Sequence, residues 1–138
     1  MTSSFDATPE ELSIVSTLWT QAQGILGEFT LSQPGLTAGS VSAALKTQTG
    51  NIYTGICLDF ACGIGFCAEH AAIADMLKAR ETVITAILAV GPQGFIPPLW
   101  SLSRIDDAGH PRNRQTQVWL RPDAYVRLTD LLPQHWLP

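Results

Sequence analysis

The sequence predicts an α/β fold in which helices flank a largely buried sheet. An amphipathic helical pattern comes first, two β-rich runs joined by a turn follow it, and a second helix then precedes an apolar, β-branched run. Hydrophobic residues make up 46% of the chain, which is enough for a packed core. With 138 residues, the chain is expected to form a single domain over residues 1–138, since domains typically have roughly 100–200 residues.

The first predicted helix begins at Pro9 and ends before Gly27. Thr8 can cap this helix, Pro9 suits its first position, and Glu11 completes a capping box. Apolar residues then recur at helical spacing up to Leu26. Residues 1–7, which precede the capping residue Thr8, are expected to be frayed.

Two strands are predicted next, Val41–Thr47 and Ile52–Cys57, joined by a turn around Gly50. The glycine-bearing stretch Asp59–Phe66 is predicted to be a loop. Cys67–Arg80 contains no Gly or Pro and is rich in Ala, so it is predicted to be a helix.

The rest of the chain is expected to complete the sheet. Thr82–Val90 is β-branched and almost entirely apolar, which is typical of a strand covered on both faces. A loop over Gly91–Pro98 and a short strand at Thr116–Leu120 are expected to follow, and Ala124–Leu132 is predicted to hold a strand end and a short helix. The pattern of Leu99–His110 predicts no element.

Composition excludes several classes of function. The net charge of −4 argues against a nucleic-acid partner, since such proteins are normally basic. The uncharged run Val83–Pro98 is too short to span a bilayer, and Met1–Glu11 lacks the pattern of a secretory signal, so no membrane partner and a cytoplasmic location are expected. Charged residues are only 14%, which favours burial of apolar surface between subunits.

Three cysteines, Cys57, Cys62 and Cys67, lie close together in the middle of the chain. An odd number argues against a disulfide framework and favours a site or a buried thiol cluster. Cys67 begins the second predicted helix, where the helix dipole favours a thiolate, and Glu69 follows two residues later. Zinc deaminases of nucleobases combine cysteine ligands, a zinc-activated water and a non-ligand glutamate in this way.

The order of a helix, a hairpin, the helix that opens with Cys67-Ala68-Glu69 and an apolar strand resembles the cytidine deaminase family. These small zinc-dependent nucleoside deaminases include cytidine deaminase and blasticidin S deaminase, and the resemblance covers approximately Ser40–Leu120. It implies a three-layer fold with a mixed sheet flanked by helices. It also implies zinc as cofactor, hydrolytic deamination of cytidine or a related aminopyrimidine nucleoside, and a homo-oligomer, either a dimer or a tetramer.

The resemblance assigns roles to particular residues. Cys67 would be a zinc ligand, and Glu69 would be the catalytic proton shuttle. Cys57-Leu58-Asp59 stands where the family has its ribose-binding Asn-x-Glu; Asp59 can accept from a ribose hydroxyl, whereas Cys57 is a poor substitute for asparagine. Phe60 and Ala68 complete the expected nucleoside-binding set, although a core or subunit-interface role suits Phe60 at least as well.

The second zinc motif of the family, Pro-Cys-x-x-Cys, is missing. Pro98 is in place, but Leu99 and Leu102 occupy the two cysteine positions, and leucine has no lone pair for zinc. A catalytic zinc takes three protein ligands and an open position, so one thiolate cannot hold it. Zinc is therefore expected to be absent or weakly bound, with Cys62 and His70 as the possible substitute ligands.

The codons of Leu99–Arg104 offer one explanation for the loss. The coding CTG TGG TCG CTG TCG CGC is permitted for these six residues; read one base later, it gives Cys-Gly-Arg-Cys-Arg, a typical continuation of the family motif. We hypothesise that a small frameshift converted the motif, either in the gene or as an error in the sequence. A different codon series on resequencing would reject this hypothesis.

Three functions stay open at this point. The first is a nucleoside deaminase with an impaired zinc site. The second is a pseudoenzyme that keeps the fold and the oligomer and at most binds a nucleoside. The third is a metal-independent amidohydrolase or thiol enzyme that uses Cys67. It is disfavoured because His70 is the one base that could pair with Cys67, and a pair three residues apart on a helix rarely has nucleophile–base geometry.

Overall fold

The computed structural model describes residues 5–60, 65–96 and 110–131. The described strands are β1 (Phe5–Asp6), β2 (Phe29–Thr30), β3 (Leu36–Thr47), β4 (Ile52–Phe60), β5 (Gly65–Phe66), β6 (Ile84–Gly91), β7 (Gly94–Phe95), β8 (Gln117–Arg121) and β9 (Ala124–Arg127). The described helices are α1 (Pro9–Gln23), α2 (Ala68–Lys78), the 3-10 helix η1 (Pro111–Gln115) and α4 (Leu128–Leu131).

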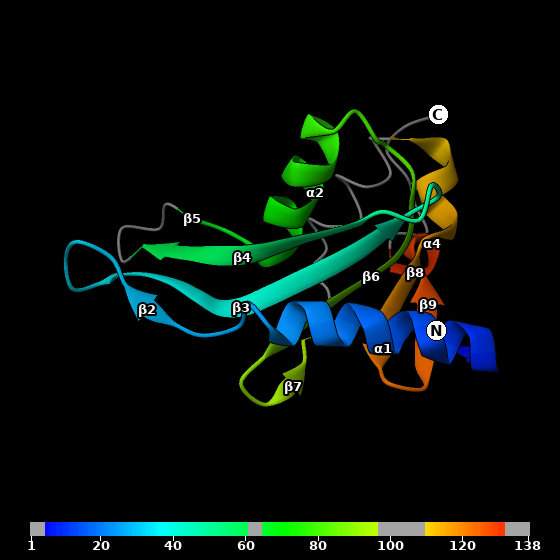
Figure 1. The fold of residues 1–138 in the computed structure, drawn as a ribbon, viewed down its shortest axis with the longest axis horizontal. Helices are drawn as coiled ribbons and strands as arrows, with labels where there is room; N and C mark the ends of the chain where they lie inside the picture. Colours follow the sequence, from blue (N-terminus) through cyan, green and yellow to red (C-terminus); the bar gives the residue numbers. More distant parts are fainter. Residues whose placement is uncertain (1–4, 61–64, 97–109, 132–138) are drawn as a thin grey trace.

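These strands form one mixed sheet in the order β1-β9-β8-β6-β3-β4-β5, with β2 paired to β3 and β7 paired to β6. The β6–β8 pair is parallel, and the other described pairs are antiparallel. Helices α1 and α2 cover opposite faces of this sheet (Figure 1). The predicted three-layer α/β fold with a mixed sheet flanked by helices is therefore confirmed.

The central strand β3 shows how the two cores arise. Ala43 and Leu45 belong to the core under α2, whereas Ala44 belongs to the core under α1, as the alternation of side chains along a strand requires. Because α2 and α1 cover the two faces, the stretch 42–45 of β3 is buried on both of them.

Helix α1 begins as predicted. The Oγ1 atom of Thr8 accepts a hydrogen bond from the Glu11 backbone N–H (3.2 Å), and the Glu11 carboxylate accepts one from the Thr8 N–H (2.9 Å). The helix ends at Gln23, earlier than predicted, and Gly24 caps it. Gly27 serves another purpose, because its N–H donates to the Gly39 carbonyl where the chain passes β3 (2.9 Å).

The stretch Asp59–Phe66, predicted to be a loop, instead contributes to a hairpin. Asp59 lies in β4 and pairs with Gly65 of β5, and Leu58 pairs with Phe66. The loop prediction was wrong at both ends because the hydrogen-bonding groups at this edge of β4 pair with β5. Similar pairing places the short strand β7 in the predicted loop Gly91–Pro98.

Helix α2 lies very close to β4 at Gly55. A Cβ atom at this glycine would lie 2.4 Å from the Ala72 nitrogen, 2.6 Å from the Ala71 Cβ and 2.7 Å from the Ala68 carbonyl oxygen. The absence of a side chain at Gly55 therefore permits the helix to approach the strand. This approach fixes the position of the first turn of α2, which carries the candidate site residues.

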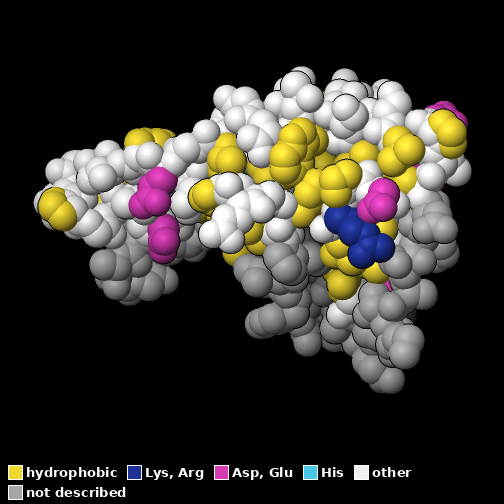
Figure 2. All heavy atoms as spheres, turned by 90° about the horizontal axis from the view of Figure 1, so that it is seen from below, with side chains coloured by type: hydrophobic (Ala, Val, Ile, Leu, Met, Phe, Trp, Pro, Cys, Tyr) yellow, Lys and Arg dark blue, Asp and Glu magenta, His cyan; other side chains and the backbone are white. Residues whose placement is uncertain are grey.

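Viewed from the side of α1, apolar side chains gather on the surface (Figure 2). Leu12 on this helix is 41% exposed, and the ring of Trp19 stacks on that of Phe95 in β7, with centroids 4.8 Å apart. Leu12, Trp19 and Phe95 line an open groove of about 510 Å³ together with Val15, Ser16 and Pro122. Across the described ranges, no helix is both long and apolar enough to cross a membrane.

Candidate functional site

The candidate site lies at the start of α2. Cys67 occupies the N-cap position in an extended conformation (φ −75°, ψ 155°), and its side chain makes no capping hydrogen bond. Ala68 is fully buried, and Glu69 follows in the first turn with only 4% of its surface exposed. The Cys67-Ala68-Glu69 motif therefore has the helix-start geometry that the sequence predicts.

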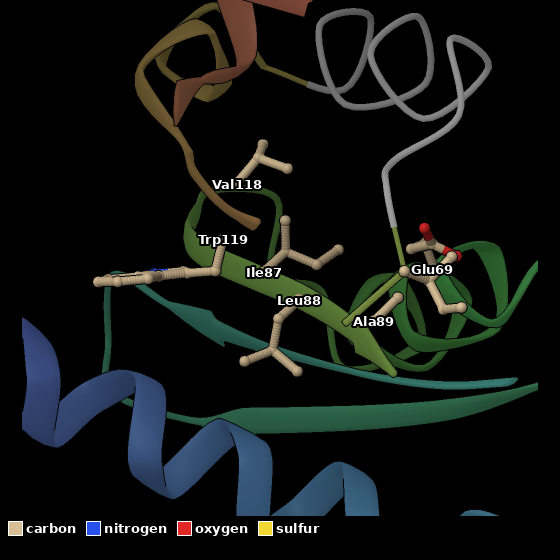
Figure 3. Close-up of a pocket in the computed structure, with 7 residues that line it drawn as sticks. Glu69, Ile87, Leu88, Ala89, Val118 and Trp119 are labelled. Atoms are coloured by element: carbon tan, nitrogen blue, oxygen red, sulfur yellow. The ribbon is translucent and has the colours of Figure 1, made fainter. Parts of the chain in front are cut away.

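Glu69 borders a small cavity of about 10 Å³, which has room for about one water molecule. Figure 3 shows Glu69 at one end of this cavity, beside Ala89 of β6, with Trp119 of β8 at the other end. The other lining residues are Ile87, Leu88, Ile96 and Val118. Apart from Glu69, the lining side chains are apolar or aromatic, so this carboxyl group is the main polar feature of the cavity wall.

The surroundings of Glu69 favour its neutral form. Burial has the largest effect and raises the pKa of this carboxyl group. A hydrogen bond from its own backbone N–H and the charge of the nearby His70 lower the pKa by less. A carboxyl group with a raised pKa can donate and accept a proton near neutral pH, as a proton shuttle must.

The thiol of Cys67 differs from the sequence-based expectation. The helix dipole favours a thiolate at this position, but burial raises the pKa of Cys67, and the charges of Glu69 and Cys57 raise it further. Desolvation is the largest of these effects, and together they favour the thiol over the thiolate at this position.

Cys57 lies on β4 against a bulge in β3. Between the pairs Ala38–Leu58 and Ser42–Ile56, three residues of β3 oppose this one residue of β4. The Cys57 Sγ accepts a hydrogen bond from the Val41 N–H (3.3 Å) and lies 3.2 Å from the Ser40 Oγ. Sequence reasoning missed both partners, although Gly39, with φ +87°, is the glycine signal that indicates a bulge inside a strand.

The structure brings some of the remaining predicted residues to the site and leaves others apart. His70 lies on α2 next to Glu69, and its Nε2 atom is buried without a hydrogen-bond partner among the described residues. Asp59 is exposed on β4 and lies further along that strand than Cys57. Phe60 ends β4, and its side chain lies outside the described part, as do Cys62, Leu99 and Leu102.

Among the described residues, no set of donor side chains fits zinc. Within residues 5–60, 65–96 and 110–131, no group of three or more His, Cys, Asp or Glu side chains lies close enough to hold a metal ion. The two positions that the resemblance requires beyond these ranges are leucines, which offer no donor atom.

The fold is similar to that of solved cytidine deaminases. The enzyme from Mycobacterium leprae superposes with a TM-score of 0.71 at 18% identity, covering 87% of this chain and 98% of that one. The Mycobacterium tuberculosis enzyme superposes with a TM-score of 0.71 at 19% identity, covering 88% of this chain and 96% of that one. The Burkholderia pseudomallei enzyme superposes with a TM-score of 0.69 at 25% identity, covering 88% of this chain and 98% of that one.

No protein-family model matches the chain, and no curated protein matches it in sequence. The structural similarity extends over most of both chains in each comparison. The protein is therefore cytidine deaminase-like in its fold.

Proposed function

We propose that this protein is a cytidine deaminase-like protein in which zinc-dependent deamination of cytidine, or of a related aminopyrimidine nucleoside, is impaired. One observation carries the proposal: the start of α2 keeps Cys67 and a buried Glu69 in place, while the described residues gather no set of three metal ligands. Cys67 is the one remaining family ligand, and Leu99 and Leu102 replace the other two.

Two features argue against a rescued zinc site. The Cys57 sulfur already contacts Ser40 and Val41. His70 is a poor third ligand because it does not form a described cluster with these cysteines. Cys62 is left as the substitute that the described residues do not test.

Substrate contacts follow from the same assignment. Asp59 would accept a hydrogen bond from a ribose hydroxyl, and its exposure leaves its carboxylate oxygens free to do so. Ala68 and Cys57 would form the wall near the base, and Phe60 would stack on it. Glu69 would be the catalytic proton shuttle, with no activated water to work on in this chain.

The direct test is ammonia release from cytidine in the presence of zinc. We expect the wild-type chain to release no more ammonia than its Glu69→Gln variant, because zinc is not held. The double substitution Leu99→Cys/Leu102→Cys is expected to introduce zinc-dependent release, which a further Glu69→Gln substitution removes. Release by the wild-type chain that Glu69→Gln abolishes would contradict the proposal. A folded double variant that binds no zinc would contradict the assignment of the defect to these two leucines.

A second candidate is a pseudoenzyme that binds a pyrimidine nucleoside without converting it. The observation that favours it is the exposed Asp59 carboxylate, which does not depend on zinc. Equilibrium dialysis with radiolabelled cytidine tests this candidate, and Asp59→Ala is expected to weaken any binding. Absence of saturable binding in the wild-type chain would exclude it.

The proposal includes a homo-oligomer, either a dimer or a tetramer, without nucleic-acid or membrane partners, located in the cytoplasm. The apolar groove beside Leu12, Trp19 and Phe95 supports association between copies, since large apolar patches on soluble proteins commonly mark interfaces. Sedimentation equilibrium measures the number of subunits, and a monomer at micromolar concentration would contradict this part.

A further inference from the structure

Cys57 lies on β4, and Cys67 lies between β5 and α2, directly after the strand that pairs with β4. In the antiparallel pair of β4 and β5, Asp59 lies opposite Gly65, and Leu58 lies opposite Phe66. Continuing this register by one residue places Cys57 opposite Cys67. The described pairing ends at Leu58 and Phe66, and the next residue, Cys67, still has an extended backbone (φ −75°, ψ 155°) before α2 begins at Ala68. Figure 1 shows β5 leading directly into α2.

Directly opposed residues on antiparallel strands point their side chains to the same face, with Cα atoms about 4.5–5.5 Å apart. Disulfides usually join residues whose Cα atoms are about 4.4–6.8 Å apart, so the backbone geometry suits a covalent link. The packing agrees with this placement, because Cys57 contacts the core beneath α2 and Cys67 caps that helix.

Both thiols are open to reagents. Both cysteines are free and only partly buried, so a small oxidant has access to them. The Cys57 Sγ accepts a hydrogen bond from the Val41 N–H of β3, on the side of β4 away from β5, and the side chain would have to give up this contact to form the link.

We propose that Cys57 and Cys67 are a redox-active dithiol that closes to an intrachain disulfide when a low-molecular-weight disulfide, such as oxidised glutathione, is the oxidant. One protein thiol loses its proton and attacks a sulfur atom of the oxidant. The mixed disulfide forms, and one glutathione thiol leaves. The second protein thiolate then attacks the protein sulfur of the mixed disulfide, and the second glutathione thiol leaves. Two protein thiols are oxidised, one glutathione disulfide is reduced, and both protons end on glutathione.

The link would have a local structural effect that does not depend on the proposed function. It would tie the N-terminus of α2 to β4, two residues before Glu69, and would remove the one remaining thiol of the zinc motif as a metal ligand. Closing a short loop also restricts the unfolded chain, so the oxidised protein is expected to have a higher Tm than the reduced protein.

The test must separate this pair from links that involve Cys62. The full-length chain is equilibrated with mixtures of reduced and oxidised glutathione, quenched with acid and alkylated. Its intact mass is then measured by mass spectrometry. Cleavage of the denatured chain after Phe60 and after Phe66 then places the three cysteines on three different peptides. We expect a loss of two hydrogen atoms per chain and a linked peptide pair that carries Cys57 and Cys67.

The matched control is Cys62→Ser, which is expected to leave both results unchanged, whereas Cys57→Ser is expected to abolish the loss of two hydrogens. The peptide map of the wild-type chain identifies the linked cysteines even if a variant folds poorly. Three alkylated thiols in the most oxidising mixture would overturn the proposal. So would a link that always includes Cys62, or a stable glutathione adduct on Cys67 without the second step.

Discussion

The two ends of α2 carry glutamates in opposite environments. Glu69, in the first turn, is 4% exposed, and burial raises its pKa. Glu81, three residues beyond the end of the helix, accepts hydrogen bonds from Asn51 Nδ2 (2.9 Å), from the Tyr53 hydroxyl (2.5 Å) and from the Thr49 hydroxyl. These donors lower the pKa of Glu81 to about 2, with the Thr49 hydroxyl contributing most.

The ionised carboxylate of Glu81 stabilises the fold, whereas that of Glu69 does not. Glu81 links the β3–β4 turn to the segment after α2, and its charge is matched by three donors. Burial disfavours the ionised form of Glu69, so this carboxyl group does not stabilise the fold at pH values where it is ionised. A buried carboxyl group of this kind is a candidate functional group.

The largest expected effect comes from the close contact between Gly55 and α2, the helix that carries Glu69. Gly55→Ala would place a Cβ atom 2.4 Å from the Ala72 nitrogen, and backbone atoms cannot yield as a flexible side chain does. We expect a loss of roughly 3 kcal/mol in the free energy of unfolding, measured with urea. Gly24→Ala is the matched control, since the nearest atoms to its Cβ lie at 3.5 Å. A loss of equal size at Gly24 would show that the close approach of α2 is not the cause.

The second prediction concerns Glu69. Because its folded-state pKa is raised, Glu69 contributes fully to stability below the unfolded value of 4.5, and this contribution is lost as the pH rises through the folded-state pKa. Glu69→Gln should match the wild-type chain at pH 4 and exceed it in stability at pH 7. One pKa unit of difference corresponds to about 1.4 kcal/mol. A variant that is less stable than the wild type at pH 7 would show that Glu69 has a stabilising partner, such as a metal-bound water.

The smallest effect is expected at Glu81, at the surface. Its folded-state pKa is lowered, so its contribution is present above about 4.5 and is lost as the pH falls towards about 2. Urea unfolding across this pH window should show a weaker loss of stability in Glu81→Gln than in the wild-type chain. Tyr53→Phe removes one donor and should give an intermediate slope; equal slopes in all three proteins would reject the role of this cluster.

Local signals made part of the molecule predictable. The capping box at Thr8 and Glu11 fixes the start of α1, and the β-branched run before Gly91 identifies β6, because each signal depends on neighbouring residues alone. The β4–β5 hairpin and the bulge beside Cys57 depend on pairing between strands, which residue patterns do not reveal.

The candidate site was predictable to a similar extent. The Cys67-Ala68-Glu69 motif placed both side chains at a helix start, as the structure has them. The apolar wall of Ile87, Ala89 and Val118 comes from strands distant in sequence, and it is this wall that buries Glu69. Desolvation of Cys67 likewise arises from tertiary packing, so the helix-dipole argument alone gave the wrong direction for its pKa.

We propose that the fold has kept Glu69 of a deaminase-like site without the ligands for zinc. Elemental analysis of the folded, full-length chain, expressed and dialysed with zinc present and then freed of excess metal, tests this claim most directly. We predict far less than one zinc per chain, together with a cooperative unfolding transition that zinc does not shift. A stoichiometric zinc that raises the Tm would contradict the claim and would require Cys67 to share the metal with ligands that the described residues do not reveal.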